Sequence, residues 1–259
     1  MKKVVVCYKW LLDDADIRVN ESTRQLDTSK AKYKVNEYDR NAIEAGVQLK
    51  KATGCELVGI TCGVKAKDST KDALSRGLDS VTYLAAPATA NADSGATAKA
   101  LAAMIKNLGA DVVLCSEGSS DEYAQQTSSR LAALLGFASV SFAHSIEVAG
   151  DTLKIDRKMD DGIEKVEVAG PVVISVVPDI NEAPIPSVKQ ILGAKKKPAK
   201  EIDLGALGLS DADIAPQLKV ESVLAPVVSR KGIRLNAGDV TIAAAAADLV
   251  KKLGAEGVL

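Results

Sequence analysis

The segment Ala110–Gly136, ADVVLC-SEGSSDEYAQQTSSR-LAALLG, decides the fold of this chain. Its first six residues form a short apolar run, which is typical of a strand buried on both faces. Its last six residues have helical spacing and end at Gly136, a common helix stop. A strand that passes through a small-residue turn into a helix leaves backbone N–H groups free at the positive end of that helix. Phosphate groups bind well at such a position.

The turn inside this segment predicts an anion site that uses no basic side chain. No Lys or Arg occurs from Ser116 to Ser129, so an anion there would depend on backbone N–H groups, hydroxyls and the helix dipole. The turn has neither a G-x-G-x-x-G motif nor a P-loop, so the glycine mechanisms of those motifs do not apply. An ordinary strand–helix connection with a serine cap is the alternative explanation of the same residues.

Composition narrows the class of protein. With 259 residues, 47% of them apolar, the chain allows one large domain, with or without an appendage. A net charge of −1 and only 3% aromatic residues argue against nucleic-acid binding. We expect no direct membrane insertion, since no apolar run is long enough to span a bilayer and the N-terminus lacks the pattern of a signal peptide.

The four cysteines have no C-x-x-C spacing, which argues against a zinc ribbon or a thioredoxin-type motif. Reduced thiols in a cytoplasmic protein fit this spacing best. Three of the cysteines, Cys7, Cys62 and Cys115, each close an apolar run. If these runs are neighbouring strands, the thiols gather at one edge of the sheet. Each thiol also fits the role of a small buried hydrophobe.

Apolar runs and helical segments alternate along most of the chain. Strands are expected over 3–7, 56–62, 81–84 and 110–115, and helices over 41–51, 68–76 and 94–108. This alternation predicts an α/β fold, a Rossmann-like parallel sheet with helices on both faces. In such sheets ligands bind outside the carboxyl ends of the strands.

The helix that begins near Asn36 would reach the same edge of the sheet. Asn36 is a good N-cap residue, and Glu37 and Asp39 suit the first turn of a helix. Simple capping of this helix is therefore an alternative to a binding role for Asn36 and Asp39.

The pattern changes after Phe137. Polar and apolar residues alternate over 145–148, 152–156 and 165–168, which predicts an antiparallel meander inserted before a last sheet strand at 172–177. A small hairpin is expected from 17–19 and 24–26. His144 is the only histidine, and without a partnered nucleophile we expect it to be structural.

The C-terminal part has weak periodicity, interrupted by prolines. We expect residues 1–195 to form an adenine-nucleotide-binding α/β domain, and residues 196–259 to form an extended arm that packs on a partner subunit. The arm ends in a helix over 241–253, with an apolar face of Ile242, Ala245, Leu249, Val250 and Leu253. The lysine run 195–197 is either a docking patch or a solvated surface.

Several segments together resemble a known family. They are VVVCYK (4–9), VNEYDRNAIEA (35–45), ITCG (60–63), DALSRG (72–77), EGSSDEYAQQT (117–127), DINEAPIPS (179–187) and ILGAKKKP (191–198). The chain resembles, nearly from end to end, the β subunit of electron-transfer flavoproteins. The resemblance is closest to the Fix-type β subunit linked to carnitine metabolism.

The resemblance implies a cofactor site in a two-subunit electron carrier. Family members pair with a larger α subunit that carries a reactive FAD. Their β subunit holds AMP in simple carriers, or a second FAD in members that bifurcate electrons from NADH, and both ligands remain open here. The implied cofactor-binding residues are Cys7, Asn36, Glu37, Tyr38, Asp39, Cys62, Ser116, Gly118, Ser119, Ser120, Asp121, Tyr123, Ala124, Gln125, Gln126 and Thr127.

The resemblance also implies a loop that docks onto redox partners of the acyl-CoA dehydrogenase type, with Val188 as its apolar anchor. The implied docking residues are Pro184, Ile185, Val188, Ile191, Lys195, Lys196 and Lys197.

An electron-carrier subunit without catalytic residues or a metal site is therefore the leading interpretation. A stand-alone ATP- or AMP-binding sensor of the universal-stress type is the main alternative, although a compact sensor does not need the long arm. A hydrolase or ligase that uses the same edge ranks last, since the chain has one histidine and no P-loop lysine.

Overall fold

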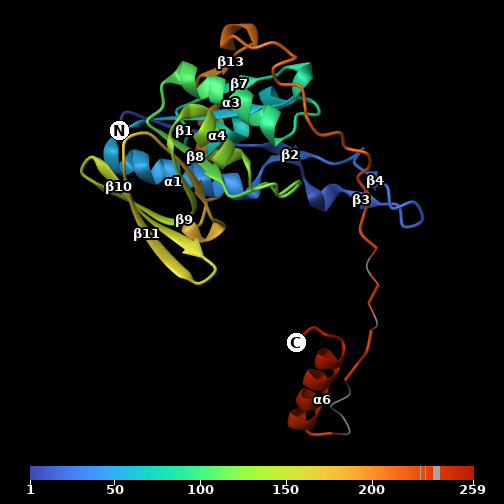
Figure 1. Cartoon of the computed structure of the whole chain (residues 1–259). Helices are drawn as coiled ribbons and strands as arrows, with labels where there is room; N and C mark the ends of the chain where they lie inside the picture. Colours follow the sequence, from blue (N-terminus) through green and yellow to red (C-terminus); the bar gives the residue numbers. More distant parts are fainter. Residues whose placement is uncertain (228, 231, 236–239) are drawn as a thin grey trace.

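A sheet of nine strands organises the chain, in the order β11-β10-β9-β12-β8-β1-β6-β7-β13 (Figure 1). This computed structural model describes residues 1–227, 229–230, 232–235 and 240–259. The parallel centre of the sheet consists of β12 (Val172–Val176), β8 (Val112–Ser116), β1 (Lys3–Cys7), β6 (Glu56–Cys62) and β7 (Ser80–Leu84). The predicted α/β fold and its central strands are confirmed.

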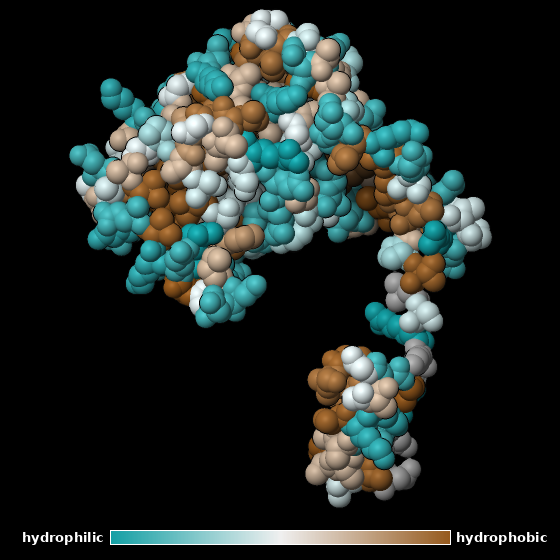
Figure 2. All heavy atoms as spheres, viewed as in Figure 1, coloured by the Kyte–Doolittle hydropathy of each residue, from teal (hydrophilic) through white to brown (hydrophobic). Residues whose placement is uncertain are grey.

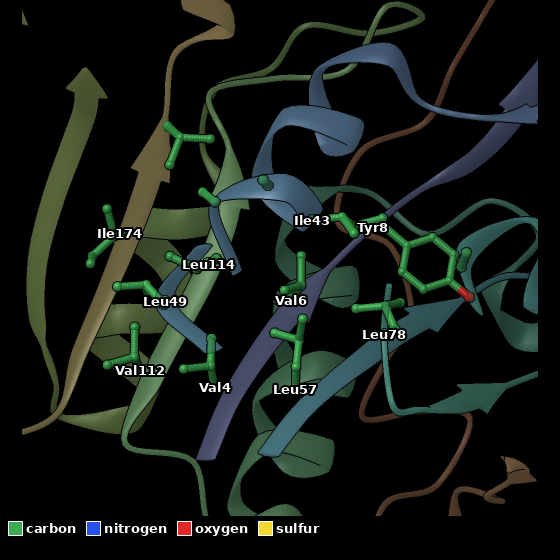
Figure 3. Close-up of a cluster of buried hydrophobic side chains, with 14 of the residues drawn as sticks. Val4, Val6, Tyr8, Ile43, Leu49, Leu57, Leu78, Val112, Leu114 and Ile174 are labelled. Atoms are coloured by element: carbon green, nitrogen blue, oxygen red, sulfur yellow. The ribbon is translucent and has the colours of Figure 1, made fainter. Parts of the chain in front are cut away.

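Helices cover both faces of this sheet. They are α1 (Glu37–Thr53), α2 (Thr70–Ser75), α3 (Ser94–Leu108) and α4 (Thr127–Leu135). Alternate residues of a strand point to opposite faces. Val4 and Val6 accordingly pack in the core cluster that contains α1 residues, whereas Val5 packs in the cluster that contains α3 residues. Figure 3 shows Val4, Val6, Leu57 and Leu114 of the strands in one cluster with Ile43 and Leu49 of α1.

The predicted meander is present and extends one side of the sheet. Its strands are β9 (Ala138–Ala149), β10 (Thr152–Met159) and β11 (Gly162–Ala169). β9 pairs parallel with β12 and antiparallel with β10, so the meander joins the central sheet. Two small antiparallel sheets lie outside it: β2 (Trp10–Leu12) with β5 (Tyr33–Val35), and the expected hairpin of β3 (Arg18–Val19) with β4 (Leu26–Asp27).

The first part of the predicted arm packs on the α/β domain. After α5 (Val188–Ala194), strand β13 (Ala199–Glu201) pairs with β7, and Ile202, Leu204 and Ile214 are buried in the core. The extended part of the arm therefore begins after Ile214. It ends in α6 (Ile242–Ala255), which buries none of its residues and lies apart from the sheet in Figure 1. In the described part of the chain, no helix combines the length and apolarity needed to cross a bilayer.

A glycine lets α1 lie close against the sheet. A Cβ atom on Gly46 would lie 2.7 Å from Cδ1 of Leu57 and 3.1 Å from Cγ2 of Val6, and both of these residues are fully buried. We expect Gly46→Ala to destabilise the fold by about 1–2 kcal/mol, since overpacking outweighs the better helix propensity of alanine. Urea unfolding measures this change.

Gly193 of α5 is the matched control, because a Cβ atom there would meet no neighbour within 4 Å. Gly193→Ala should leave the free energy of unfolding unchanged or raise it by up to about 1 kcal/mol. Equal effects of the two substitutions would contradict the close approach of α1 to β6.

Candidate functional site

A cavity of about 490 Å³ opens at the carboxyl edge of the sheet. Its wall includes Cys7 at the end of β1, Cys62 at the end of β6, and Ser116 at the end of β8. Asp39 of α1 and Thr127 of α4 complete it from the helical layers. The cavity lies at the edge where doubly wound sheets bind ligands, and its size suits a small ligand.

Most of the residues implied by the resemblance line this cavity. They are Cys7, Asn36, Asp39, Cys62, Ser116, Gly118, Ser119, Asp121, Ala124, Gln125, Gln126 and Thr127. The structure places Glu37, Tyr38, Ser120 and Tyr123 outside the lining. Glu37 pairs with Lys34, and the rings of Tyr38 and Tyr123 pack against each other with centroids 5.8 Å apart. This ring contact joins the first turn of α1 to the loop.

Asn36 connects the start of α1 to the loop after β8. It occupies the N-cap position, but its side chain makes no capping hydrogen bond. Its Nδ2 group donates to the carbonyl of Gly118 (3.1 Å), and its Oδ1 atom accepts from the N–H of Ser120 (3.1 Å). The capping explanation is thus wrong for the side chain of Asn36, which is completely buried and holds the loop.

Asp39 is a buried carboxylate at the junction of two strands. Its Oδ2 atom accepts the N–H of Lys9 (2.7 Å), and its Oδ1 atom accepts the hydroxyl of Ser116 (2.5 Å). Burial raises the pKa of Asp39 to about 6, because desolvation of the charged form outweighs these hydrogen bonds. Asp39 therefore does more than support the first turn of α1.

The loop between β8 and α4 has an unusual backbone. Tyr123 and Gln125 have positive φ angles of 46° and 55°, which non-glycine residues rarely adopt. Gly118 is needed because a Cβ atom there would lie 2.7 Å from the ring of Tyr123. The hydroxyl of Tyr123 donates to Oε1 of Glu117 (2.7 Å). These contacts hold the loop in one shape over the cavity.

Helix α4 begins at the wall of the cavity without a side-chain cap. Among the residues that the structure describes, none caps α4 with its side chain, whereas Asp93 caps α3 through the N–H of Ala96 (2.8 Å). Thr127 and Ser128 line the cavity at the start of α4. Amides at the positive end of a helix, together with hydroxyl groups, suit the phosphate of a nucleotide. The donor set therefore fits a phosphate-bearing ligand.

Sequence reasoning missed a basic residue beside the loop. The loop has no Lys or Arg before Arg130, but Lys9, two residues after β1, also lines the cavity. Its Nζ atom lies 2.7 Å from Oδ2 of Asp121 and 3.8 Å from Oε1 of Glu122. The sequence feature that could have identified Lys9 is its position just after a predicted strand.

A second group that sequence reasoning missed is aromatic. Trp10 and Tyr33, from the small sheet of β2 and β5, stack with ring centroids 6.2 Å apart. The Nζ atom of Lys65 lies 4.4 Å from the centroid of the Tyr33 ring. All three residues line the cavity, so one end of it is aromatic. The connection from β7 to α3 adds Thr89, Ala90 and Ala92, and the first turn of α3 adds Ser94 and Thr97.

The predicted gathering of three thiols is confirmed. Cys7, Cys62 and Cys115 all line the cavity and are free. The pKa of Cys7 is raised by its contact with Cys115 and by burial, and burial raises the pKa of Cys62 to about 12. At neutral pH the thiols of Cys7 and Cys62 thus form an unreactive floor. His144 lies exposed on β9, away from the lining.

Within the described ranges of the chain, no group of His, Cys, Asp and Glu side chains is arranged to hold a metal ion.

The residues implied for docking lie on α5 and directly before and after it. Ile185 and Val188 are 93% and 72% exposed, and Pro184, Ile191, Lys195 and Lys196 are exposed as well. Lys197 differs, because its ammonium donates to the carbonyls of Leu74 (3.1 Å) and Leu78 (2.6 Å). The side chain of Lys197 therefore stabilises the turn after α2.

Fold and cavity together define a doubly wound α/β domain with a cavity at the carboxyl edge of its sheet, where such folds bind ligands. The family model of the electron transfer flavoprotein domain matches residues 23–207, more than two thirds of the chain. The chain belongs to this family, whose members carry electrons between redox partners.

Asp39 predicts a specific pH dependence of stability. The folded protein binds a proton at Asp39 more tightly than the unfolded chain, in which an aspartate has a pKa of about 3.9. Its stabilising contribution is thus complete below about pH 4 and is lost as the pH rises through about 6. The loss amounts to about 3 kcal/mol for a shift of about two pKa units.

Asp39→Asn isolates this effect, because asparagine does not titrate and still offers one acceptor and one donor. We expect the free energy of unfolding of the native protein, minus that of Asp39→Asn, to fall between about pH 4 and 6.5. Urea unfolding at several pH values measures the difference. A difference that stays constant with pH would contradict a raised pKa at Asp39.

Proposed function

We propose that this chain is the β subunit of a heterodimeric electron-transfer flavoprotein, and that its cavity holds AMP or the adenylate part of a second FAD. One observation carries the proposal. In a chain of this family, the uncapped start of α4 and the loop held by Asn36 line the same cavity. Such a combination of free amides, hydroxyls and small residues suits an adenylate.

The residues of this chain would bind and position the ligand. Amides and hydroxyls at Thr127 and Ser128 would hold a phosphate, while Asn36 and Asp39 would fix the loop and the strand ends around it. The flavin supplies the redox chemistry when bound. The chain would act as an electron-carrier subunit and not as an enzyme.

Two exposed apolar elements support docking to other proteins. On α6, Ile242, Leu249 and Val250 are exposed, and Figure 2 shows apolar spheres on this helix. We assign α6 and the extended arm to the FAD-carrying α subunit. We assign the segment around Val188 to a redox partner of the acyl-CoA dehydrogenase type, with Fix-type carnitine metabolism as the setting. Four free cysteines agree with a reducing cytoplasmic location.

Co-expression with a candidate α subunit tests the proposed function. We expect a yellow complex of two unlike chains, whose visible spectrum is that of a flavin. Counting flavin and AMP per heterodimer distinguishes a simple carrier, with one FAD and one AMP, from a bifurcating one with two FAD. A colourless single chain that binds ATP would contradict the proposal and favour the sensor of universal-stress type.

Leu249→Asp should weaken the complex with the α subunit by about tenfold or more, because it places a charge in the apolar face of α6. The stability of the α/β domain should not change, since α6 buries none of its residues. Ala247→Asp introduces the same charge towards the other side of the helix and serves as the control. Equal loss of complex in both variants would contradict docking through this face.

A further inference from the structure

The charges around the cavity present a difficulty for a phosphate-bearing ligand. In the described part of the chain, the basic residues of the lining are Lys9 and Lys65. The acidic residues of the lining are Asp39, Glu117, Asp121 and Glu122. A phosphate that enters therefore meets more carboxyl groups than ammonium groups, and repulsion weakens its binding unless one cation is redirected to it.

Lys9 is placed to be that cation. Its backbone is fixed from both sides, because its N–H donates to Asp39 (2.7 Å) and its carbonyl accepts the N–H of Asn36 (3.0 Å). Its side chain is 40% exposed and ends 2.7 Å from Asp121 at the rim of the loop. A lysine stem is long and flexible, so the ammonium can move while the backbone stays in place.

The ion pair between Lys9 and Asp121 can readily open, so that Lys9 can bind another anion. Both side chains are more than one third exposed, and exposed ion pairs add little net stability. A hydrogen bond between an ammonium and a phosphate inside a cavity is stronger. Opening the ion pair and forming a phosphate contact is therefore a favourable exchange.

We propose that Lys9 is a phosphate-binding residue that changes partner, pairing with Asp121 in the empty cavity and with the phosphate of the bound nucleotide. Asp121 then acts as a competitor for the ammonium as well as a support for the loop. This inference rests on the proposed function, because it takes an adenine nucleotide as the ligand.

Calorimetric titration of the full chain with AMP and with adenosine tests the exchange. Lys9→Met should weaken AMP binding by about tenfold or more, since a charge-assisted hydrogen bond is lost. Adenosine has no phosphate, so its affinity should change by less than about twofold. Asp121→Asn should tighten AMP binding by about threefold, because the competing carboxylate is gone.

The sign of the Asp121→Asn effect separates the two roles of the ion pair. If Lys9 only holds the loop in place, Asp121→Asn weakens AMP binding as Lys9→Met does, and the proposal is overturned. Hydrogen exchange at the amide of Ser120, which bonds to Asn36, reports whether the loop remains formed in each variant.

Lys67→Met is the matched control, because Lys67 is an exposed lysine near the cavity but outside its lining. Its AMP affinity should stay within about twofold of that of the native chain. A loss as large as that of Lys9→Met would overturn the proposal, since net charge alone would explain both losses. If the native chain binds neither AMP nor FAD, the proposed function fails as well. If it binds AMP and the Lys9 and Asp121 variants bind equally well, only the role of Lys9 fails.

Discussion

The shape of the cavity depends on the hydrogen bonds that the buried carboxylate of Asp39 accepts. This carboxylate accepts the N–H of Lys9 just beyond β1 and the hydroxyl of Ser116 at the end of β8, so one side chain of α1 joins the ends of two neighbouring strands. A carboxylate in this position is costly, because burial removes it from water. Its raised pKa is the measure of that cost. The geometry persists because the sheet and the helix hold each of its partners in place.

The contacts that shape the cavity become more exposed with distance from Asp39. Asn36, one turn before Asp39, holds the near part of the loop through Gly118 and Ser120. The far part of the loop depends on more exposed contacts, such as the ion pair of Lys9 with Asp121 and the packing of Tyr38 against Tyr123. Buried hydrogen bonds are expensive to break, whereas exposed ion pairs are not. The hydrogen bonds of Asp39 and Asn36 therefore cost more to break than the ion pair of Lys9 with Asp121.

The surfaces assigned to partner proteins lie outside this cavity but are connected to it. Asp93 caps α3, whose first turn reaches the cavity, and the same carboxylate accepts the N–H groups of Gln217 (2.6 Å) and Leu218 (3.1 Å) at the start of the extended arm. Further along, the N–H of Ala225 donates to the carbonyl of Arg24 in the β3–β4 hairpin. The path of the arm thus begins at the edge of the site.

The sequence by itself determined the alternation of strands and helices, the meander and the edge at which the cavity lies. These features follow from the period of apolar residues, which is a local property of the chain, and from the rule that parallel strands present their carboxyl ends at one edge. The same rule brought Cys7, Cys62 and Cys115 together correctly. Only the tertiary structure decided which side chains meet at that edge. Asn36 and Gly118 are 82 positions apart, and Lys197 lies 119 positions from Leu78. Lys9 follows β1 but pairs with Asp121, which lies in the loop after β8. Such pairings depend on strand register, helix placement and side-chain direction, and no local pattern encodes these.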